Sequence, residues 1–252
     1  MSKRHSAKLT RLIRAAHLAL HIGYGLLTAA LVLPWVKAAR RDRIISRWCR
    51  HLLGVFNIRL VLHGQVPERD ASGILFVANH VSWIDIYAIN SVRAVRFVAM
   101  AEIRRWPVLG WLAAQANTLF TNRSKRHEAG RLVQDVADSL NAGDCLCYFP
   151  EGSTSDGSQL KPFKSSLLQA AVDADAIVWP VAILYPDESG QPDPELSYAN
   201  RTLWGSVKQV LAQQAPIVEL HFDKPISAIG QDRRALSSSI RACIAGRLKL
   251  MH

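Results

Sequence analysis

A histidine and an aspartate five positions apart, His80 and Asp85, are the residues in this sequence best suited to do chemistry. An imidazole that bonds a carboxylate through one ring nitrogen keeps the other nitrogen free to take a proton, which is how a general base is built. On one continuous helix, five residues at roughly 100° each would place the two side chains about 140° apart. The carboxylate therefore reaches the imidazole only if the chain turns just after His80 and a helix begins near residues 82–85.

The elements on either side of this pair fit such a turn. The apolar run 73–78 reads as a buried strand, and the segment 84–89 can begin a helix. Taken alone, however, the pair has a second interpretation. It can be a strand-end histidine in a satisfied hydrogen-bond network beside an aspartate that caps a helix.

Two further polar groups follow apolar strands in the same way. Arg123 comes after the strand-like residues 118–121, and Glu151 comes after 145–149 and opens the turn Glu-Gly-Ser-Thr-Ser. Loops at the ends of strands gather where α/β sheets bind ligands. We therefore expect His80, Asp85, Arg123 and Glu151 to converge, with the backbone amides and hydroxyls of the turn available to a polar headgroup.

Strands alternate with helices along most of the chain, which predicts an α/β fold with a central mixed β-sheet flanked by helices. The predicted first strand is 55–63. The 252 residues fit one α/β domain with an appendage, so we expect an N-terminal helical membrane-binding module at 1–54 and the α/β domain at 55–252.

The net charge of +11 comes entirely from residues 1–60, which include twelve basic residues and a single acid, Asp42. The rest of the chain has 19 basic and 19 acidic residues and is neutral. A nucleic-acid binder more often has its charge on the folded domain, so we expect no nucleic-acid partner. The four cysteines form no Cys-x-x-Cys pair, which favours a reducing, cytoplasmic environment.

The N-terminal module has the composition of a membrane-associated segment. Residues 15–36 have no formal charge and would reach about 33 Å as a helix, enough to cross a hydrocarbon core. A spanning helix and a helical hairpin that dips into one leaflet both remain open. Residues 40–53 alternate arginines with Ile44, Ile45, Trp48 and Leu52, as in a basic amphipathic helix on an anionic bilayer. The alternative is a solvated helix packed on the domain. We expect association with the cytoplasmic face of the inner membrane.

Four motifs in this order resemble those of the glycerolipid acyltransferase family, in the branch that acylates 1-acylglycerol-3-phosphate. They span about residues 74–184. The first is Asn-His-x4-Asp, which begins at Asn79, and the second is Phe-x-x-Arg, which ends at Arg123. The third resembles Phe-Pro-Glu-Gly-Thr-Arg-Ser and occurs as Phe149, Pro150, Glu151, Gly152, Ser153, Thr154 and Ser155. The fourth is an apolar strand that contains Pro180.

The resemblance implies direct acyl transfer to a lysolipid. His80, oriented by Asp85, would deprotonate the free hydroxyl, which attacks the thioester of acyl-carrier protein or acyl-CoA. The resemblance further implies no acyl-enzyme, no metal and no cofactor besides that co-substrate. Glu151 and Arg123 would hold the acceptor headgroup, together with Gly152 and Ser153 of the turn. The lipid acceptor fits the expected contact with a membrane surface.

One departure from the family pattern concerns the acceptor. Thr154 stands where the third motif has an arginine associated with the acceptor phosphate, and a hydroxyl cannot replace a bidentate guanidinium contact. Either Lys161, Lys164 or Arg123 takes that role, or the acceptor has no terminal phosphate. Some relatives acylate lyso-ornithine lipid, and residues 153–157 resemble that group. Lysophosphatidic acid, which would yield phosphatidic acid, is the first interpretation and lyso-ornithine lipid the second.

Other classes of protein fit the sequence less well. A serine hydrolase needs a Gly-x-Ser-x-Gly elbow, which is absent. The nine histidines are scattered and none lies in a His-Glu-x-x-His pattern, so we expect no metal site. A non-catalytic membrane-associated lipid-binding protein of the same fold is the alternative from another class. Acyl-chain length and oligomeric state have no signature in the sequence.

Overall fold

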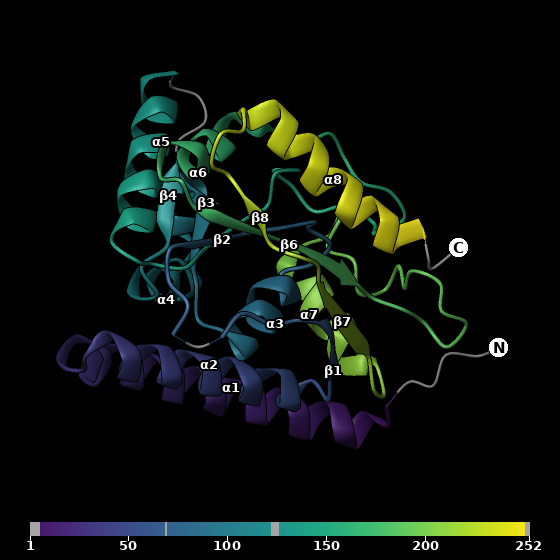
Figure 1. The fold of residues 1–252 in the computed structure, drawn as a ribbon. Coiled ribbons are helices and arrows are strands. Elements are labelled where there is room, and N and C mark those ends of the chain that lie inside the picture. Colours follow the sequence, from purple (N-terminus) through teal and green to yellow (C-terminus); the bar gives the residue numbers. More distant parts are fainter. Residues whose placement is uncertain (1–5, 69, 122–125, 250–252) are drawn as a thin grey trace.

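The computed structural model describes residues 6–68, 70–121 and 126–249 and is built around an eight-stranded mixed sheet (Figure 1). The strand order is β1-β7-β6-β2-β5-β3-β4, and β8 pairs with β6 beside that path. Five pairs of neighbouring strands are parallel, namely the four pairs between β6 and β4 and the pair β1–β7, whereas β6 pairs antiparallel with β7 and β8. The expected mixed sheet is confirmed.

The strands are short and connected mostly by helices. They are β1 (Arg59–Gly64), β2 (Ile74–Ala78), β3 (Arg96–Met100), β4 (Leu119–Thr121), β5 (Leu146–Tyr148), β6 (Ile177–Leu184), β7 (Ile217–Phe222) and β8 (Ile226–Ser227). The α-helices are α1 (Lys8–Leu31), α2 (Ala38–Val55), α3 (Ile84–Val92), α4 (Leu109–Gln115), α5 (Arg126–Asn141), α6 (Leu168–Asp173), α7 (Leu203–Ala212) and α8 (Arg233–Lys249). The 3₁₀ turns are Leu33–Trp35, Ala101–Arg105 and Ser165–Leu167.

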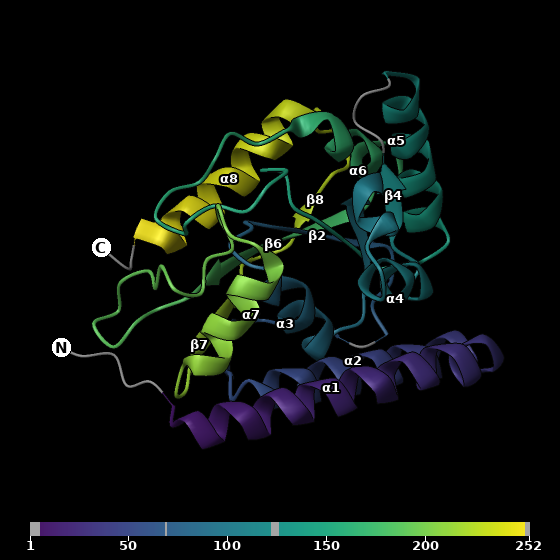
Figure 2. The same ribbon diagram turned by 180° about the vertical axis from the view of Figure 1, so that it is seen from behind.

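The sheet separates two hydrophobic cores. One core lies between the sheet and α2, α3 and α7, and it contains Phe76, Ile84 and Leu220. The other lies on the opposite face under α5, α6 and α8, where Val77 and Ile240 are buried (Figures 1 and 2). The central strand β2 is buried along its whole length, as expected for a parallel strand covered on both faces. Its continuous apolar run is therefore explained by burial on both sides.

Pro180 lies in the interior of β6, where proline is unusual because it has no amide proton for the ladder. On one side of β6 the pairing partner changes from β8, at residues 177–178, to β7, at residues 181–184. Pro180 lies between these two paired segments, and its carbonyl accepts a hydrogen bond from the amide of Asp223 at 3.0 Å. The missing amide proton therefore interrupts neither ladder.

Helices α1 and α2 form an antiparallel hairpin along one side of the domain (Figures 1 and 2). The rings of His21 and Trp48 stack at a centroid distance of 4.8 Å, and each side chain bonds the backbone carbonyl of the other residue. Gly25 lets Trp48 approach, since a Cβ there would lie 2.5 Å from Nε1 of the indole. The amide of Ser6 and the guanidinium of Arg14 bond carbonyls at the end of α7, which ties the start of α1 to the domain.

The structure corrects two expectations about this region. First, α2 continues to Val55 and β1 begins at Arg59, so the first strand starts four residues later than expected. Second, the apolar side of α2 faces the protein: Leu52 is buried, and Ile44, Ile45 and Trp48 are half-buried. A helix packed on the domain was the alternative, and it describes the contacts of α2 better than a helix resting on lipid.

A group of exposed large apolar side chains lies on α1 and the turn that follows. They are Leu9, Leu12, Ile13, Leu20, Tyr24, Leu27, Leu31 and Trp35. By length and composition, 8–35 is the one segment of the described residues that could cross a membrane, with 22% of its apolar window buried. Such a helix near the N-terminus is weak grounds for a membrane span. The boundary at residue 54 between a membrane module and the domain stays a prediction.

Candidate active site

The parallel strands β2, β5 and β4 end at the same edge of the sheet, as their pairing requires. The end of β2 leads into His80, and the end of β5 leads into Phe149, Pro150 and Glu151. The loops that follow β2 and β5 therefore meet, as expected. Arg123, which follows β4 in the sequence, lies outside the described residues, so its place in this group stays a prediction.

Asp85 folds back onto His80 because α3 begins only at Ile84, after a turn. The carboxylate Oδ2 accepts a hydrogen bond from Nδ1 of His80 at 2.7 Å and from the backbone amides of Val81 at 2.8 Å and Ser82 at 2.9 Å. Asp85 is fully buried. The carboxylate therefore holds the turn before α3 and bonds the imidazole, but it does not cap the helix, since α3 has no side-chain cap hydrogen bond.

Tyr185 completes the hydrogen bonding of Asp85. Its hydroxyl donates a short hydrogen bond to Oδ1, the oxygen that His80 does not use. Burial and the negative charge of Asp85 raise the pKa of Tyr185 well above its ordinary value, so the phenol stays a donor. Sequence reasoning missed this residue. Its signal was its position directly after β6, the strand that contains the fourth motif.

The imidazole of His80 is stacked on an aromatic ring and is partly exposed to solvent. Its ring stacks on Phe149 at a centroid distance of 4.1 Å and an interplanar angle of 11°. Its side chain is 18% exposed. Because Asp85 takes the proton-bearing Nδ1, the lone pair resides on Nε2. The ring can therefore accept a proton at a defined atom near the surface.

Glu151 and Ser155 fix the backbone of His80 from opposite sides. Oε1 of Glu151 accepts from the amide of His80 at 2.8 Å, and the amide of Ser155 donates to the carbonyl of His80 at 2.7 Å. Oε2 of Glu151 accepts from the amide of Lys161 at 3.0 Å. Burial raises the pKa of Glu151, while its hydrogen bonds and the nearby cations oppose that shift. In this geometry the carboxylate braces two loops.

The loop after Glu151 presents polar groups beside this brace. Gly152 has φ +74°, in the left-handed region that favours glycine. The ammonium of Lys161 donates to Oγ of Ser153 at 3.1 Å and to the carbonyl of Thr154 at 2.6 Å. The structure thus brings Gly152, Ser153, Thr154 and Lys161 together with His80 through Glu151.

Lys164 contributes to the structure of this loop through its backbone. It is exposed, its amide donates to the carbonyl of Pro150 at 2.9 Å, and its carbonyl accepts from the hydroxyl of Tyr148 at 2.8 Å. These bonds tie the segment before α6 to the end of β5. The headgroup role expected for its ammonium has no contact to support it among the described residues.

Asn79 holds the end of β2 in place. Its side-chain amide donates to the carbonyl of Ile183 at 2.9 Å, and its Oδ1 accepts from the amide of Ile183 at 2.7 Å. This buried pair of bonds continues the contact between β2 and β6 one residue past the strand, where the backbone has begun to turn. The position of His80 is thereby fixed relative to Tyr185, which follows β6.

Taken together, these contacts give an oriented imidazole whose Nε2 can take a proton from a hydroxyl, supported by a buried carboxylate and surrounded by fixed loops. Among the described residues, no serine hydroxyl or cysteine thiol is bonded to the imidazole ring of His80; its ring partner is Asp85, and the hydroxyl of Ser155 donates to the backbone carbonyl of His80. The arrangement therefore suits removal of a proton from a substrate rather than from a side chain of the protein.

Comparison with known proteins finds acyltransferases. The model of the acyltransferase family matches residues 59–184, from β1 to the end of β6. The 1-acyl-sn-glycerol-3-phosphate acyltransferase of Neisseria meningitidis serogroup B is 36% identical over 210 residues, which are 81% of this chain and 82% of that protein. The lyso-ornithine lipid O-acyltransferase of Pseudomonas aeruginosa is 32% identical over 246 residues, 94% of this chain and 93% of that protein.

A solved structure has the same fold. The 1-acyl-sn-glycerophosphate acyltransferase from Thermotoga maritima superimposes with a TM-score of 0.65 at 19% identity, covering 94% of this chain and 97% of that chain. The likeness includes the N-terminal helices as well as the sheet, since it extends over almost the whole of both chains.

Proposed function

This chain belongs to the acyltransferase family, and from that premise we propose that it transfers a fatty acyl group from a thioester to the free hydroxyl of a lysolipid, with His80 as the general base. The observation that supports the proposal best is the 2.7 Å hydrogen bond between Nδ1 of His80 and buried Asp85. It leaves Nε2 as the proton acceptor. The donor is the thioester of acyl-carrier protein or of CoA.

In the proposed reaction, Nε2 of His80 removes the proton from the acceptor hydroxyl as its oxygen attacks the thioester carbonyl. The new ester C–O bond forms, the C–S bond breaks, and the imidazolium returns its proton to the departing thiolate. Asp85 stabilises the imidazolium and holds its tautomer. The protein needs no covalent intermediate for this sequence of bonds.

The first candidate acceptor is 1-acyl-sn-glycerol 3-phosphate, which would give phosphatidic acid. Relatives at 36% identity have this activity in their names. Lys161 supplies a cation in the loop of the third motif, where it bonds the neutral oxygens of Ser153 and Thr154. We propose that this ammonium, with Arg123, attracts the phosphate in place of the arginine that Thr154 replaces.

Lyso-ornithine lipid is a second candidate, and the charges near Lys161 favour it. Glu151 and Asp156 both interact electrostatically with this lysine, and with Lys164 included the charges of the loop cancel, so it has no excess of positive charge for a phosphate. An amino-acid headgroup with an ammonium tolerates that balance better than a phosphate does. The relative that covers 94% of this chain is a lyso-ornithine lipid O-acyltransferase.

We further propose that the hairpin of α1 and α2 attaches the enzyme to the cytoplasmic face of the membrane that contains its acceptor. The exposed side chains that support this are apolar on α1, with Trp35 84% exposed at the turn. The basic residues Lys37, Arg40, Arg43 and Arg47 are exposed on the same hairpin. Apolar insertion combined with attraction to anionic headgroups is how a monotopic helical segment binds a bilayer.

The proposal is tested by acyl transfer with purified protein in detergent. Acyl-carrier-protein and CoA thioesters of one chain length serve as donors, and lysophosphatidic acid and lyso-ornithine lipid serve as acceptors in parallel. His80→Ala is the negative control, and His17→Ala, an exposed histidine on α1, is the matched control. We expect product with wild type and His17→Ala and a loss of at least about 100-fold with His80→Ala, the lower bound for a general base.

Product from lysophosphatidic acid alone supports the phosphatidate-forming activity, and product from the ornithine acceptor alone assigns the second candidate. If His80→Ala is as active as wild type, the proposed mechanism is wrong. If wild type binds the lysolipids and acylates neither, the chain is better described as a lipid-binding protein of this fold.

A further inference from the structure

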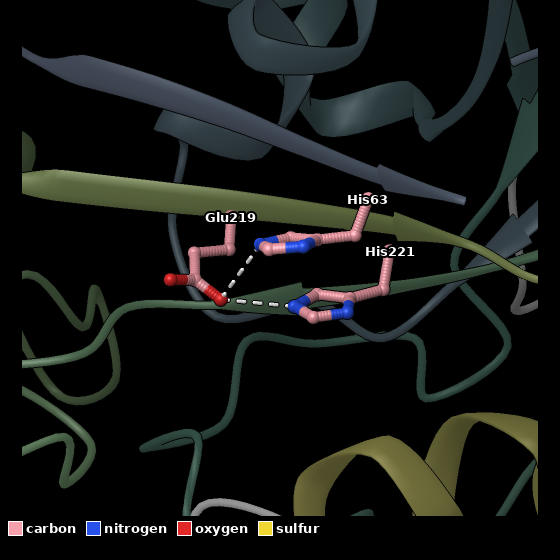
Figure 3. A group of neighbouring side chains, drawn as sticks. All are labelled: His63, Glu219 and His221. Atoms are coloured by element: carbon pink, nitrogen blue, oxygen red, sulfur yellow. Dashed lines mark hydrogen bonds and ion pairs between the residues drawn. The ribbon is translucent and has the colours of Figure 1, made fainter. Parts of the chain in front are cut away.

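Three side chains that the catalytic site does not use converge on the surface of the sheet: His63 on β1, and Glu219 and His221 on β7 (Figure 3). His63 pairs in register with His221 across the two parallel strands. Glu219 precedes His221 by two residues, so it projects from the same face of the sheet. Figure 3 shows all three side chains extending from neighbouring strands toward one point.

The geometry of this His63–Glu219–His221 cluster is that of a set of metal ligands. The carboxylate Oε2 of Glu219 lies 2.9 Å from Nε2 of His221 and 3.4 Å from Nε2 of His63. The atoms that could ligate an ion all lie within 4.8 Å of one another. Ligands at about 2.0–2.1 Å from one tetrahedral ion are separated by roughly 3.3 Å, so small movements suffice to enclose a cation.

The cluster is accessible to solvent and has a net negative charge. The side chain of His63 is 44% exposed, whereas those of Glu219 and His221 are 27% and 19% exposed. The positive charge of Arg247 on α8 acts on His221, but this guanidinium is itself paired with Asp223 at 3.4 Å. With Glu219 included, these groups sum to one negative charge, which favours a cation.

We propose that His63, Glu219 and His221 bind a first-row divalent transition-metal ion, with Zn²⁺ as the best match. Two imidazole nitrogens and one carboxylate oxygen are a donor set that Zn²⁺ accepts, and water can fill the fourth position. The two rings are stacked with their centroids 4.1 Å apart and an interplanar angle of 13°, and Nε2 of each ring lies beside Oε2 of Glu219. Binding requires one ring to tilt toward the other, and exposed His63 is the ring with freedom to do so.

An ion at this cluster would be structural, because the cluster lies on the sheet face opposite the catalytic histidine. Ala182 of β6, which is in register with His221, belongs to the core under α8, whereas His80 stacks on Phe149 of the other core. β1 is the edge strand of the sheet and directly follows α2. A metal that joins β1 to β7 would thus fasten the helical hairpin to the sheet.

The expectation that the chain has no metal site rested on local histidine patterns. This cluster has no local pattern, because its ligands come from strands at opposite ends of the domain sequence and meet only through the pairing of β1 with β7. The inference is independent of the proposed acyl transfer, since it concerns another face of the sheet.

The test uses tag-free, chelator-treated full-length protein in detergent, with Zn²⁺ binding measured by isothermal titration calorimetry. We expect one ion per chain in wild type and at least a tenfold weaker affinity in His63→Gln, whose exposed side chain can be changed without disturbing the core. His17→Gln on α1 is the matched control and should bind as wild type does. Zn²⁺ should also raise the Tm of wild type and of His17→Gln, but not that of His63→Gln.

Co²⁺ provides a second measurement that needs no variant. A site of two imidazoles, a carboxylate and water predicts visible d–d absorption without the near-ultraviolet charge-transfer band of a thiolate ligand. Equal Zn²⁺ affinity in wild type and His63→Gln would overturn the proposal, as would a thiolate band, which would place the ion on one of the four free cysteines. Absence of any binding by wild type would also overturn it, leaving a hydrogen-bonded cluster only.

Discussion

The sheet presents two groups in which histidine meets a carboxylate, and they differ in which atoms are used. In the first, Nδ1 of His80 bonds Asp85, so the second nitrogen, Nε2, is available to a substrate. In the second, the Nε2 atoms of His63 and His221 both point at Glu219. The same residue types are therefore arranged in one place as our proposed proton acceptor and in the other as our proposed set of metal ligands.

The carboxylates of the two groups also differ in how deeply they are buried. Asp85 is fully buried and accepts hydrogen bonds from two backbone amides, His80 and Tyr185, so its charge is fully compensated. Glu219 is 27% exposed and bonds imidazoles only among its described contacts. A carboxylate that is fixed by several donors can orient a base, whereas one that shares its oxygen between movable rings can follow an incoming ion.

The largest effect is expected from Asp85→Asn. The amide cannot serve as the same acceptor for His80, Val81 and Ser82, and it favours the tautomer of His80 that places the proton on Nε2. We expect kcat to fall by about 10³–10⁴-fold, the size of effect seen when a buried aspartate that orients a catalytic histidine is changed to asparagine. Steady-state acyl-transfer kinetics measure it, with circular dichroism to establish that the variant is folded.

A folded Asp85→Asn variant with more than about a tenth of the wild-type kcat would contradict the claim that Asp85 orients His80 for proton transfer. It would mean that the carboxylate serves the turn after β2 and that the tautomer of His80 is set in some other way.

Tyr185→Phe should have the next largest effect. It removes one donor to the charged oxygen Oδ1 of Asp85 and leaves the shape of the side chain almost unchanged. A hydrogen bond to a charged group contributes about 1.5–3 kcal/mol, so we expect a loss of stability of this order and a fall in kcat of about tenfold. KM for the lysolipid should stay the same, because Tyr185 is buried beneath His80 and Asp85 and its hydroxyl is bonded to Asp85.

A purely structural Tyr185 would lower Tm and leave kcat per folded molecule unchanged. Kinetics at a temperature well below the Tm of the variant, together with urea unfolding, separate these two outcomes.

Glu151→Gln extends the comparison to a third carboxylate. Glu151 accepts hydrogen bonds from backbone amides, whereas Asp85 and Glu219 bond imidazoles. Burial raises the pKa of Glu151 in the folded protein. For an acid whose folded pKa is raised, the stability contribution is present at low pH and is lost as the pH rises through the folded pKa. We therefore expect the free energy of unfolding of Glu151→Gln, measured relative to wild type, to increase as the pH rises above the ordinary range of a glutamate.

Denaturant unfolding at a series of pH values measures this trend, and Glu188→Gln, on the exposed loop after β6, is the matched control. A difference that does not vary with pH, or that moves the other way, would show that the hydrogen bonds to His80 and Lys161 outweigh burial. The effect on kcat should be smaller than that of Tyr185→Phe, because Glu151 reaches His80 only through its backbone amide.

The first of the two groups was predictable from the sequence because it is local. A buried strand, a turn and a helix start follow one another within residues 74–92, and a turn at this place brings Asp85 within reach of His80. The loop of Glu151 was placed correctly for a related reason: parallel strands that pair must end at the same edge. The headgroup roles of Lys161, Lys164 and Arg123 stay predictions, since contacts with a substrate are what would test them.

The parts that could not be predicted depend on contacts between distant segments. Tyr185 reaches Asp85 only because β6 lies beside β2, and His63 meets His221 only because β1 pairs with β7 in one register. The direction of the apolar side of α2 is a similar case. The apolar side of a basic amphipathic helix suits a bilayer and a protein surface equally well, and only the packing of Leu52 shows that this side of α2 faces the domain.

Glu219→Gln in metal-free protein should have the smallest effect. The ion pairs of Glu219 involve partly exposed side chains, and such pairs contribute less than about 1 kcal/mol. We expect the free energy of unfolding, measured in chelator and urea, to change by no more than that, whereas the corresponding change at Asp85 leaves several buried donors without a charged acceptor. A loss in Glu219→Gln as large as in Asp85→Asn would show that the second group is held as firmly as the first. It would then be part of the folded core rather than a set of side chains free to rearrange around an ion.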